Sequence, residues 1–348
     1  MENNKQDWKD EFIKLMFPID PNDIEFERAL NLKNNNIPKS IFRYYSINVY
    51  SLINLQNNTV WLAAPKVYND PYDSSLVVNL EYDLSKLEDP TFLNYIVKQF
   101  KIKMPEGLKE ILLCEQLNLK EKLSNIIKLD NKNRSNEDVE QMVNLLFKAY
   151  DHVNNKNLSK VGHDSNRENL RICSFSEVGD SVVMWSHYAA NHTGFCLEYD
   201  KDQLKTYNVL LNLFYPVIYK SELFDESNYH KEIIDNFNKT KSFEDNTKNP
   251  DIAPFNIFLP TLAAMHKSIE WSYEKEWRII IQIGSDGKDY MEFQMPRPKT
   301  ILLGSKMSEG DKEIIKKIAL NLGITVFQMY PSSTEFKMIA KPISNPSS

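Results

Sequence analysis

Short apolar runs of strand length alternate with stretches of helical spacing along most of the chain. Runs of roughly four to eight apolar or β-branched residues between turn-forming residues predict strands. They lie at residues 41–45, 59–63, 170–175, 194–199, 213–219, 276–283, 290–295, 300–303, 325–329 and 335–341. Apolar positions that recur every three or four residues predict helices at 48–55, 180–191 and 307–322, with Asp180 capping the second and Gly323 ending the third.

Residues 83–154 follow a different pattern, with long stretches of helical spacing interrupted by a polar segment at 130–136. We interpret them as a helical insertion, and residues 1–38 as a helical or irregular lead-in. The whole chain, 1–348, is predicted to form a single α+β domain. Its sheet is expected to be mixed, mostly antiparallel and split, with helices flanking it.

Composition narrows the class of protein. Hydrophobic residues make up 42% of the 348 residues, enough for a large core, so a disordered chain is excluded. The net charge of −6 is spread along the sequence and gives no global reason to bind nucleic acid or an anionic membrane. Cys114, Cys173 and Cys196 form no Cys-x-x-Cys pair, so neither a disulfide framework nor a zinc site is expected. No signal peptide or membrane span is recognised, and we expect a cytoplasmic protein.

Paired carboxylates stand at the start of one predicted strand. Glu274, Glu276 and Arg278 share one face of that strand because side chains alternate, while Trp277 and Ile279 point the other way. Carboxylates this close repel, which raises one pKa unless a cation compensates, and this suits acid, base or cation-stabilising roles. The same spacing also fits a solvent-exposed strand end without a catalytic role, in which Glu274 or Glu276 forms an ion pair with Arg278 or a lysine.

Two other strands carry polar residues that a buried sheet seldom contains. Ser174 and Ser176 share a face, so their hydroxyls are expected to meet a ligand or to bond to the backbone. No Gly-x-Ser-x-Gly elbow surrounds them, so a nucleophilic-serine hydrolase is not expected. Arg43 lies beside Tyr44 among aromatic residues, where its guanidinium could hold a phosphate or carboxylate, or only pack against a ring.

Two further segments are ambiguous. Tyr68 and Asp70 belong to an Asn-Asp-Pro turn that offers too few regularly spaced oxygens for calcium. His187 and His192 are five residues apart, whereas a helical metal pair is normally four apart and needs a third ligand. No metal site is therefore predicted, and His187 is expected to bond to the backbone or to donate to a ligand.

These segments resemble a bacterial family catalogued as domain of unknown function 2971. The resemblance rests on Tyr-Asn-Asp-Pro at 68–71, the long run from Cys173 to Tyr199, and Glu-Lys-Glu-Trp-Arg at 274–278. It spans about residues 40–330, with 83–154 peculiar to this chain. The family implies no activity.

A second resemblance does imply an activity. The order arginine, Ser-x-Ser, Glu-x-Glu is similar to that of the Arg-Ser-Glu class of ADP-ribosyltransferases, which cleave NAD at the nicotinamide ribosyl bond and transfer ADP-ribose to a macromolecule. The resemblance implies that Glu276 is catalytic, that Glu274 orients the acceptor, and that a toxin or anti-phage role is conceivable. It also implies that Arg43, Ser174 and Ser176 belong to the NAD-binding site, and to these we add Tyr44 and Tyr68, whose rings can stack on nicotinamide, and His187.

Two alternatives from other classes remain open. The same arginine, serines and aromatic residues could bind a nucleotide signal without turnover. A metal-dependent nuclease or other hydrolase could use Asp70, His187, Glu274 and Glu276 with Mg²⁺ or Mn²⁺. Nicotinamide release distinguishes the first alternative from a transferase, and a metal requirement distinguishes the second.

Overall fold

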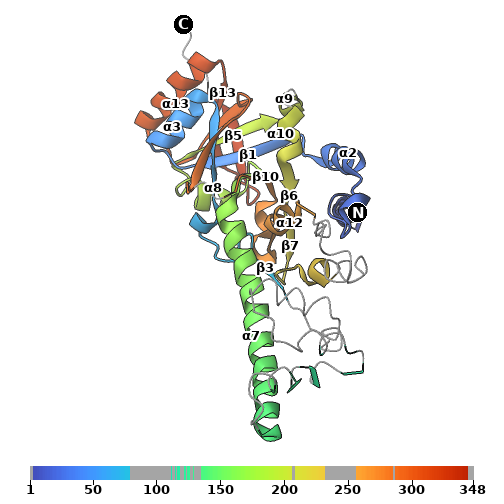
Figure 1. The fold of residues 1–348 in the computed structure, drawn as a ribbon. Coiled ribbons are helices and arrows are strands. Elements are labelled where there is room, and N and C mark those ends of the chain that lie inside the picture. The colour runs from blue at the N-terminus through green and yellow to red at the C-terminus, as the bar shows by residue number, and fades with distance from the viewer. Residues whose placement is uncertain are drawn as a thin grey trace.

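The protein has an α+β fold built on one large sheet, which confirms the fold class predicted from the sequence. The computed structural model describes residues 3–78, 135–205, 208–231, 256–284 and 287–343, with a few residues between 111 and 128. Within these residues ten strands form one sheet flanked by helices (Figure 1). Only β12 and β13 pair in parallel in this sheet, so it is mixed and mostly antiparallel.

The strands of the large sheet are β1 (Ser40–Tyr45), β2 (Thr59–Ala63), β4 (Leu170–Ser176), β5 (Phe195–Asp200), β6 (Phe214–Pro216), β10 (Glu276–Gln282), β11 (Tyr290–Gln294), β12 (Thr300–Leu303), β13 (Thr325–Pro331) and β14 (Met338–Pro342). Two short parallel pairs lie apart from it: β3 (Leu76–Val77) with β8 (Phe224–Asp225), and β7 (Ile218–Lys220) with β9 (His266–Ser268).

The described α-helices are α1 (Asn3–Met16), α2 (Phe26–Asn36), α3 (Val49–Asn57), α7 (Asn136–Asn169), α8 (Val182–Tyr188), α9 (Lys201–Lys205), α10 (Asn208–Leu213), α12 (Leu259–Met265) and α13 (Glu309–Leu322). Three 3₁₀ turns add η1 (Pro21–Asp23), η2 (Pro65–Val67) and η5 (Ile269–Glu274). Figure 1 shows α3 and α13 together on one side of the sheet and α7 extending away from it.

The sheet splits at β4. One edge of β4 pairs with β10 along its whole length, from Leu170 opposite Gln282 to Ser176 opposite Glu276. The other edge meets two strands in turn, β2 at Ile172 and β1 at Ser176. Because β1 and β2 diverge from this shared edge, the backbone leaves an opening between them over the middle of β4.

Both faces of the central strands β4 and β10 are buried, which fits their apolar residues on both sides. Cys173 and Phe175 of β4 pack with Ile279 in a core that α3 and α13 help to cover. Leu170 and Ile172 point the other way, into a second core that contains residues of α1 and α12. Charged residues on these strands therefore need partners inside the protein.

Local sequence signals place several helix ends. Asn48 caps α3 through a reciprocal pair of hydrogen bonds with Ser51, and Gly323 ends α13 with φ of 65°, as predicted. The prediction that Asp180 caps the following helix is wrong, because the Ser181 hydroxyl accepts the Met184 N–H and α8 begins at Val182.

Two strands predicted from the sequence differ in extent from the strands in the structure. In the segment predicted as one strand at 213–219, Leu213 ends α10 and the rest is divided between β6, which pairs with β10, and β7, which pairs with β9. The strand predicted at 335–341 begins only at Met338, because residues 332–337 close a turn in which Ser332 N–H bonds to the Lys337 carbonyl.

The predicted insertion lies mostly outside the described residues. Its last part, from Asn136, belongs to α7, which continues without a break to Asn169 and leads directly into β4. Among the helices that the structure describes, none combines the length and apolar character that crossing a membrane requires.

Candidate functional site

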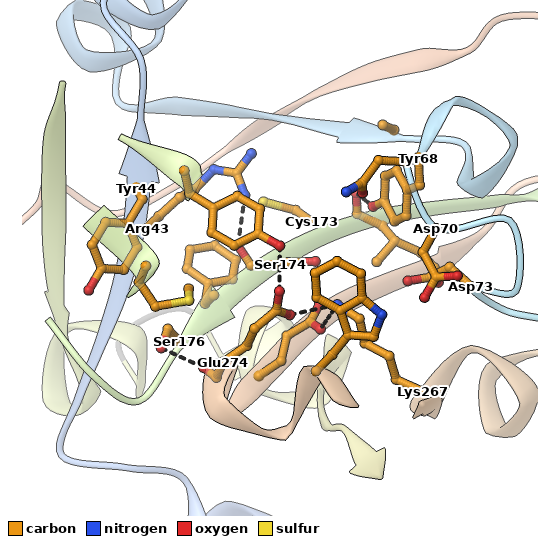
Figure 2. Close-up of a pocket in the computed structure, with 18 of the residues that line it drawn as sticks. Arg43, Tyr44, Tyr68, Asp70, Asp73, Cys173, Ser174, Ser176, Lys267 and Glu274 are labelled. Carbon is orange, nitrogen blue, oxygen red and sulfur yellow. Dashed lines mark hydrogen bonds and ion pairs between the residues drawn. The ribbon is translucent and has the colours of Figure 1, made fainter. Parts of the chain in front are cut away.

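A cavity of about 250 Å³ opens where the sheet splits. Strands β1, β2, β4 and β10 line it together with Tyr188 at the end of α8, Lys267 of β9 and Trp271 of η5. Figure 2 shows Arg43 and Tyr44 at one end of this cavity, and Tyr68, Asp70 and Asp73 at the other. Segments that are far apart in the sequence therefore meet at one concave site, which is the usual form of a small-molecule site.

A buried chain of charges forms one wall of the cavity. Arg278 is fully buried and donates two hydrogen bonds to the carboxylate of Asp73, at 2.9 and 2.7 Å. Its Nε donates to Glu276 Oε1 at 2.8 Å, and Nη1 also donates to the Ala264 carbonyl. The two carboxylates thus share one guanidinium that is held in place from three elements.

Lys267 joins the two glutamates. Its Nζ lies 2.6 Å from Glu274 Oε2 and 2.9 Å from Glu276 Oε2. Glu274 ends η5 rather than starting the strand, and Lys275 follows it in the left-handed conformation with φ of 44°. The expectation that Glu274 and Glu276 share a strand face is therefore wrong, yet the turn still brings their carboxylates to the same ammonium.

The two carboxyl groups have opposite pKa shifts. Burial alone would raise the pKa of Glu276, but Arg278 and Lys267 outweigh it and hold that pKa well below its usual range. Burial raises the pKa of Glu274, with Lys267 opposing and the Glu276 carboxylate adding to the rise. Paired carboxyl groups with separated pKa values are a common basis for dividing charge stabilisation from proton transfer.

The two serines of β4 have different roles. Ser176 is buried and donates its hydroxyl to the Glu274 carbonyl at 2.6 Å, so it positions the turn that presents Glu274. Ser174 forms a side-chain hydrogen bond with Glu276 that helps to keep this carboxylate ionised. Both serines line the cavity.

Arg43 reaches the cavity from the opposite side of the sheet. Arg43 and Tyr45 are two residues apart in β1 and so share a face of the strand. The Arg43 guanidinium carbon lies 5.1 Å from the centre of the Tyr45 ring and 5.7 Å from the centre of the Phe175 ring. Nη1 donates to the Ser174 carbonyl and Nε to the Tyr45 hydroxyl. No carboxylate pairs with Arg43 within the described part of the chain, whereas Arg278 and Lys267 both have such partners.

Tyr44 and Tyr68 line the cavity, but their hydroxyls are bonded to backbone. Tyr44 donates to the Val178 carbonyl and packs edge-on against Trp185. Tyr68 donates to the Ile172 carbonyl at 2.8 Å. Their rings are therefore held in place while their polar ends are satisfied, which suits packing against a ligand ring.

His187 and Asp70 complete the predicted set. His187 does not line the cavity, since it lies on α8 with Nδ1 3.3 Å from the Tyr273 hydroxyl. Asp70 does line it, is 8% exposed, and accepts the Tyr72 N–H. The structure thus brings together all predicted site residues except His187.

Several residues that line the cavity were not identified as site residues from the sequence, among them Asp73, Tyr188, Lys267 and Trp271. Asp73 and Tyr188 lie in segments recognised only as a turn and a helix end. Lys267 lies two residues after the apolar stretch that forms α12, and the pair of basic residues His266 and Lys267 after a buried helix is a local signal that could have indicated it.

Each glutamate of the cavity wall already has a cationic partner. A divalent cation at Glu274 or Glu276 would therefore lie close to the positive charge of Lys267 or Arg278. The described side chains include no group of three or more His, Cys, Asp or Glu residues placed to hold a metal ion.

A family model described as "Protein of unknown function (DUF2971)" matches residues 184–279. This range runs from α8 into β10 and includes Tyr188, Lys267, Glu274 and Glu276, so the chain is similar to that family over one wall of the cavity. Arg43 and the turn at 68–73 lie outside the match. No curated protein and no solved structure matches the chain.

Proposed function

We propose that the protein is an ADP-ribosyltransferase-like enzyme that cleaves the nicotinamide ribosyl bond of NAD and transfers ADP-ribose to an acceptor. The observation that carries the proposal is the convergence on one cavity of a clamped carboxylate pair, Glu274 and Glu276, with the Arg43 guanidinium, which has no carboxylate partner among the described residues. A site with this composition can stabilise a cationic sugar and bind an anionic group of the same ligand.

Glu276 is the residue suited to stabilise the transition state. Loss of nicotinamide produces an oxocarbenium-like ribosyl group, and a nearby carboxylate lowers the energy of that positive charge. Arg278 and Lys267 hold the pKa of Glu276 low, against the effect of burial, so it stays ionised at neutral pH. Three of its contacts are also to fixed donors, so little reorganisation is needed during the reaction.

Arg43 is the residue suited to hold a phosphate. The Arg43 guanidinium is half-buried and has no carboxylate partner among the described residues, so it can still pair with an anionic ligand. The cavity of about 250 Å³ is smaller than the roughly 300–1,000 Å³ typical of whole drug-sized ligands. It therefore suits the nicotinamide ribosyl phosphate half of NAD, with the adenylate half lying beyond it.

The test is nicotinamide release from ring-labelled NAD by the purified protein, with cell extract as the source of acceptors and no added metal. Glu276→Gln should lower the release rate at least about 100-fold, because the carboxylate charge is lost while the side-chain volume is retained. Glu270→Gln is the matched control, since Glu270 is exposed on the same 3₁₀ turn as Glu274. Thermal unfolding of both variants shows whether they fold.

The outcomes separate the alternatives. Release by the unsubstituted protein and by Glu270→Gln, but not by folded Glu276→Gln, with the adenylate label moving to a macromolecule, supports a transferase. Saturable NAD binding without release contradicts it and indicates a nucleotide sensor. No release together with Mn²⁺-dependent hydrolysis of nucleic acid contradicts it and indicates a metal-dependent hydrolase.

A further inference from the structure

Tyr188 is the cavity residue in direct contact with Glu274 from the side opposite Lys267. It is the last residue of α8, is half-buried, and donates its hydroxyl to Glu274 Oε1. The Lys267 ammonium donates to the other oxygen, Glu274 Oε2, at 2.6 Å. Both oxygens of this carboxylate are therefore occupied by donors from other elements, and both Tyr188 and Glu274 line the cavity.

This arrangement restricts how a proton can reach Glu274. Tyr188 and Lys267 already occupy one position on each oxygen of the Glu274 carboxylate, so a second donor has less room on either oxygen. The Tyr188 oxygen, in contrast, uses its hydrogen toward Glu274 and keeps lone pairs that can accept a hydrogen bond. A hydroxyl bound in the cavity therefore has a route to Glu274 through Tyr188.

The charges around the pair favour transfer in this direction. The titratable and charged groups around Glu274 are Tyr188 from α8, Lys267 from β9, Glu276 and Arg278 from β10, Tyr219 from β7, Tyr273 from η5, and Asp73 beyond Arg278. Burial raises the pKa of Tyr188, and the bond to Glu274 raises it further, so its hydroxyl stays protonated. Burial raises the pKa of Glu274, so this carboxyl accepts a proton more readily than Glu276.

We propose that Tyr188 is a catalytic residue that relays the proton of the attacking hydroxyl to Glu274. The inference rests on the proposed function. In the step, the bond between ribose C1′ and the nicotinamide nitrogen breaks, and its electron pair leaves with nicotinamide. The bond between C1′ and the acceptor oxygen forms, the acceptor proton moves to Tyr188 Oη, and the Tyr188 proton moves to Glu274 Oε1. Glu274 then releases its proton to solvent.

The test uses water as the acceptor and measures steady-state nicotinamide release from NAD by the full-length protein across a range of pH. Tyr188→Phe should lower kcat at least about 100-fold, as expected for loss of an acid–base group, with KM unchanged within about twofold. Tyr273→Phe is the matched control, because it removes a neighbouring hydroxyl that bonds to His187 outside the cavity. It should keep the original rate.

The pH profile separates a relay from a structural role. The unsubstituted protein should become faster as pH rises through the pKa of Glu274, because only the ionised carboxylate accepts a proton. The hydrogen bond from Tyr188 lowers the pKa of Glu274. Its loss in Tyr188→Phe should therefore move the rise of the residual rate to higher pH. Tyr188→Phe with the original kcat and pH profile would overturn the relay while leaving the proposed function intact.

A second variant covers failure of Tyr188→Phe to fold. Glu274→Gln should show the same loss of kcat without the rising limb, and the double variant should be no slower than Glu274→Gln alone, since the two residues act as one unit. Glu274→Gln with full activity overturns the relay. Absence of nicotinamide release from the unsubstituted protein overturns the proposed function and the relay together.

Discussion

Two buried lysines illustrate how the partners of a residue decide its charge. Lys267 meets the carboxylates of Glu274 and Glu276, and these outweigh burial and raise its pKa. Lys33 is also buried, but its Nζ has no carboxylate partner in the described part of the chain; it donates to the carbonyls of Leu211, Asn212 and Phe214 at 2.6–3.2 Å and lies 5.0 Å from the centre of the Tyr215 ring. Burial lowers the pKa of Lys33 to about 7. Lysine is thus permanently charged at position 267 in the site, whereas Lys33 of α2, whose ammonium lies at the end of α10, titrates near neutral pH.

The lowered pKa of Lys33 predicts that the free energy of unfolding depends on pH. Its folded pKa of about 7 lies below the unfolded value of about 10.4, so between these pH values the unfolded chain binds more protons. The free energy of unfolding should therefore rise as pH increases from about 7 to about 10, by up to about 4 kcal/mol from this group. Denaturant titrations at several pH values measure it.

The control for this prediction is a pair of methionine substitutions. Lys33→Met should flatten the rise between pH 7 and 10, because the titrating group is gone. Lys205→Met removes an exposed lysine and should leave the slope as it was. A slope that is identical in Lys33→Met and in the unsubstituted protein would contradict the assignment.

At the scale of elements, α13 is defined by its two ends. The Ser308 hydroxyl accepts the Asp311 N–H at the start, and Gly323 at the end adopts φ of 65° while its N–H bonds to the Ala319 and Leu320 carbonyls. A second glycine, Gly310, lies in the first turn with open space around its Cα. Gly323 therefore adopts a conformation that favours glycine, whereas nothing at Gly310 requires one.

Alanine at these two positions should change stability in opposite directions. Gly323→Ala should destabilise the protein by about 1 kcal/mol, because a side chain disfavours the left-handed region. Gly310→Ala should stabilise it by up to about 1 kcal/mol, because alanine favours the helix and its Cβ meets no atom closer than 4.0 Å. Chemical denaturation measures both, and effects of the same sign would contradict this interpretation.

At the scale of the whole molecule, the cavity connects distant parts of the chain. Arg43, Asp73, Tyr188 and Glu276 come from four separate segments, and the opening exists because β1 and β2 diverge at β4. A ligand in this opening contacts elements from both sides of the split. Binding is therefore expected to stabilise the fold globally rather than one loop.

Ligand-dependent unfolding tests both the cavity and the role of Arg43. A ligand at about 100 times its Kd stabilises a protein by about 2.7 kcal/mol. At equal concentration, nicotinamide mononucleotide should raise Tm more than nicotinamide riboside, because only the former has a phosphate for Arg43. Arg43→Gln should remove the difference, and Arg43→Lys should keep part of it. Equal shifts for the two ligands in the unsubstituted protein would exclude a phosphate site at Arg43.

Most of the sheet could be predicted because its information is local. The strands at 59–63 and 300–303 and the end of α13 follow from runs of apolar residues and from a glycine that fits its turn. The continuous helix through Asn169 and the division of 213–219 could not, because both depend on what the backbone meets in space. The segment 213–219 divides because it pairs first with β10 through β6 and then with β9 through β7.

The sequence by itself determined which residue types gather at the site: one arginine, two serines and two glutamates on or beside apolar strands that cannot bury them without partners. Tertiary structure alone decided their charge and roles. Asp73 and Lys267 supply the countercharges to Arg278 and the glutamates, yet they lie far from one another along the chain. Coulomb interactions and desolvation depend on distance in space, and spacing along a sequence does not contain that distance.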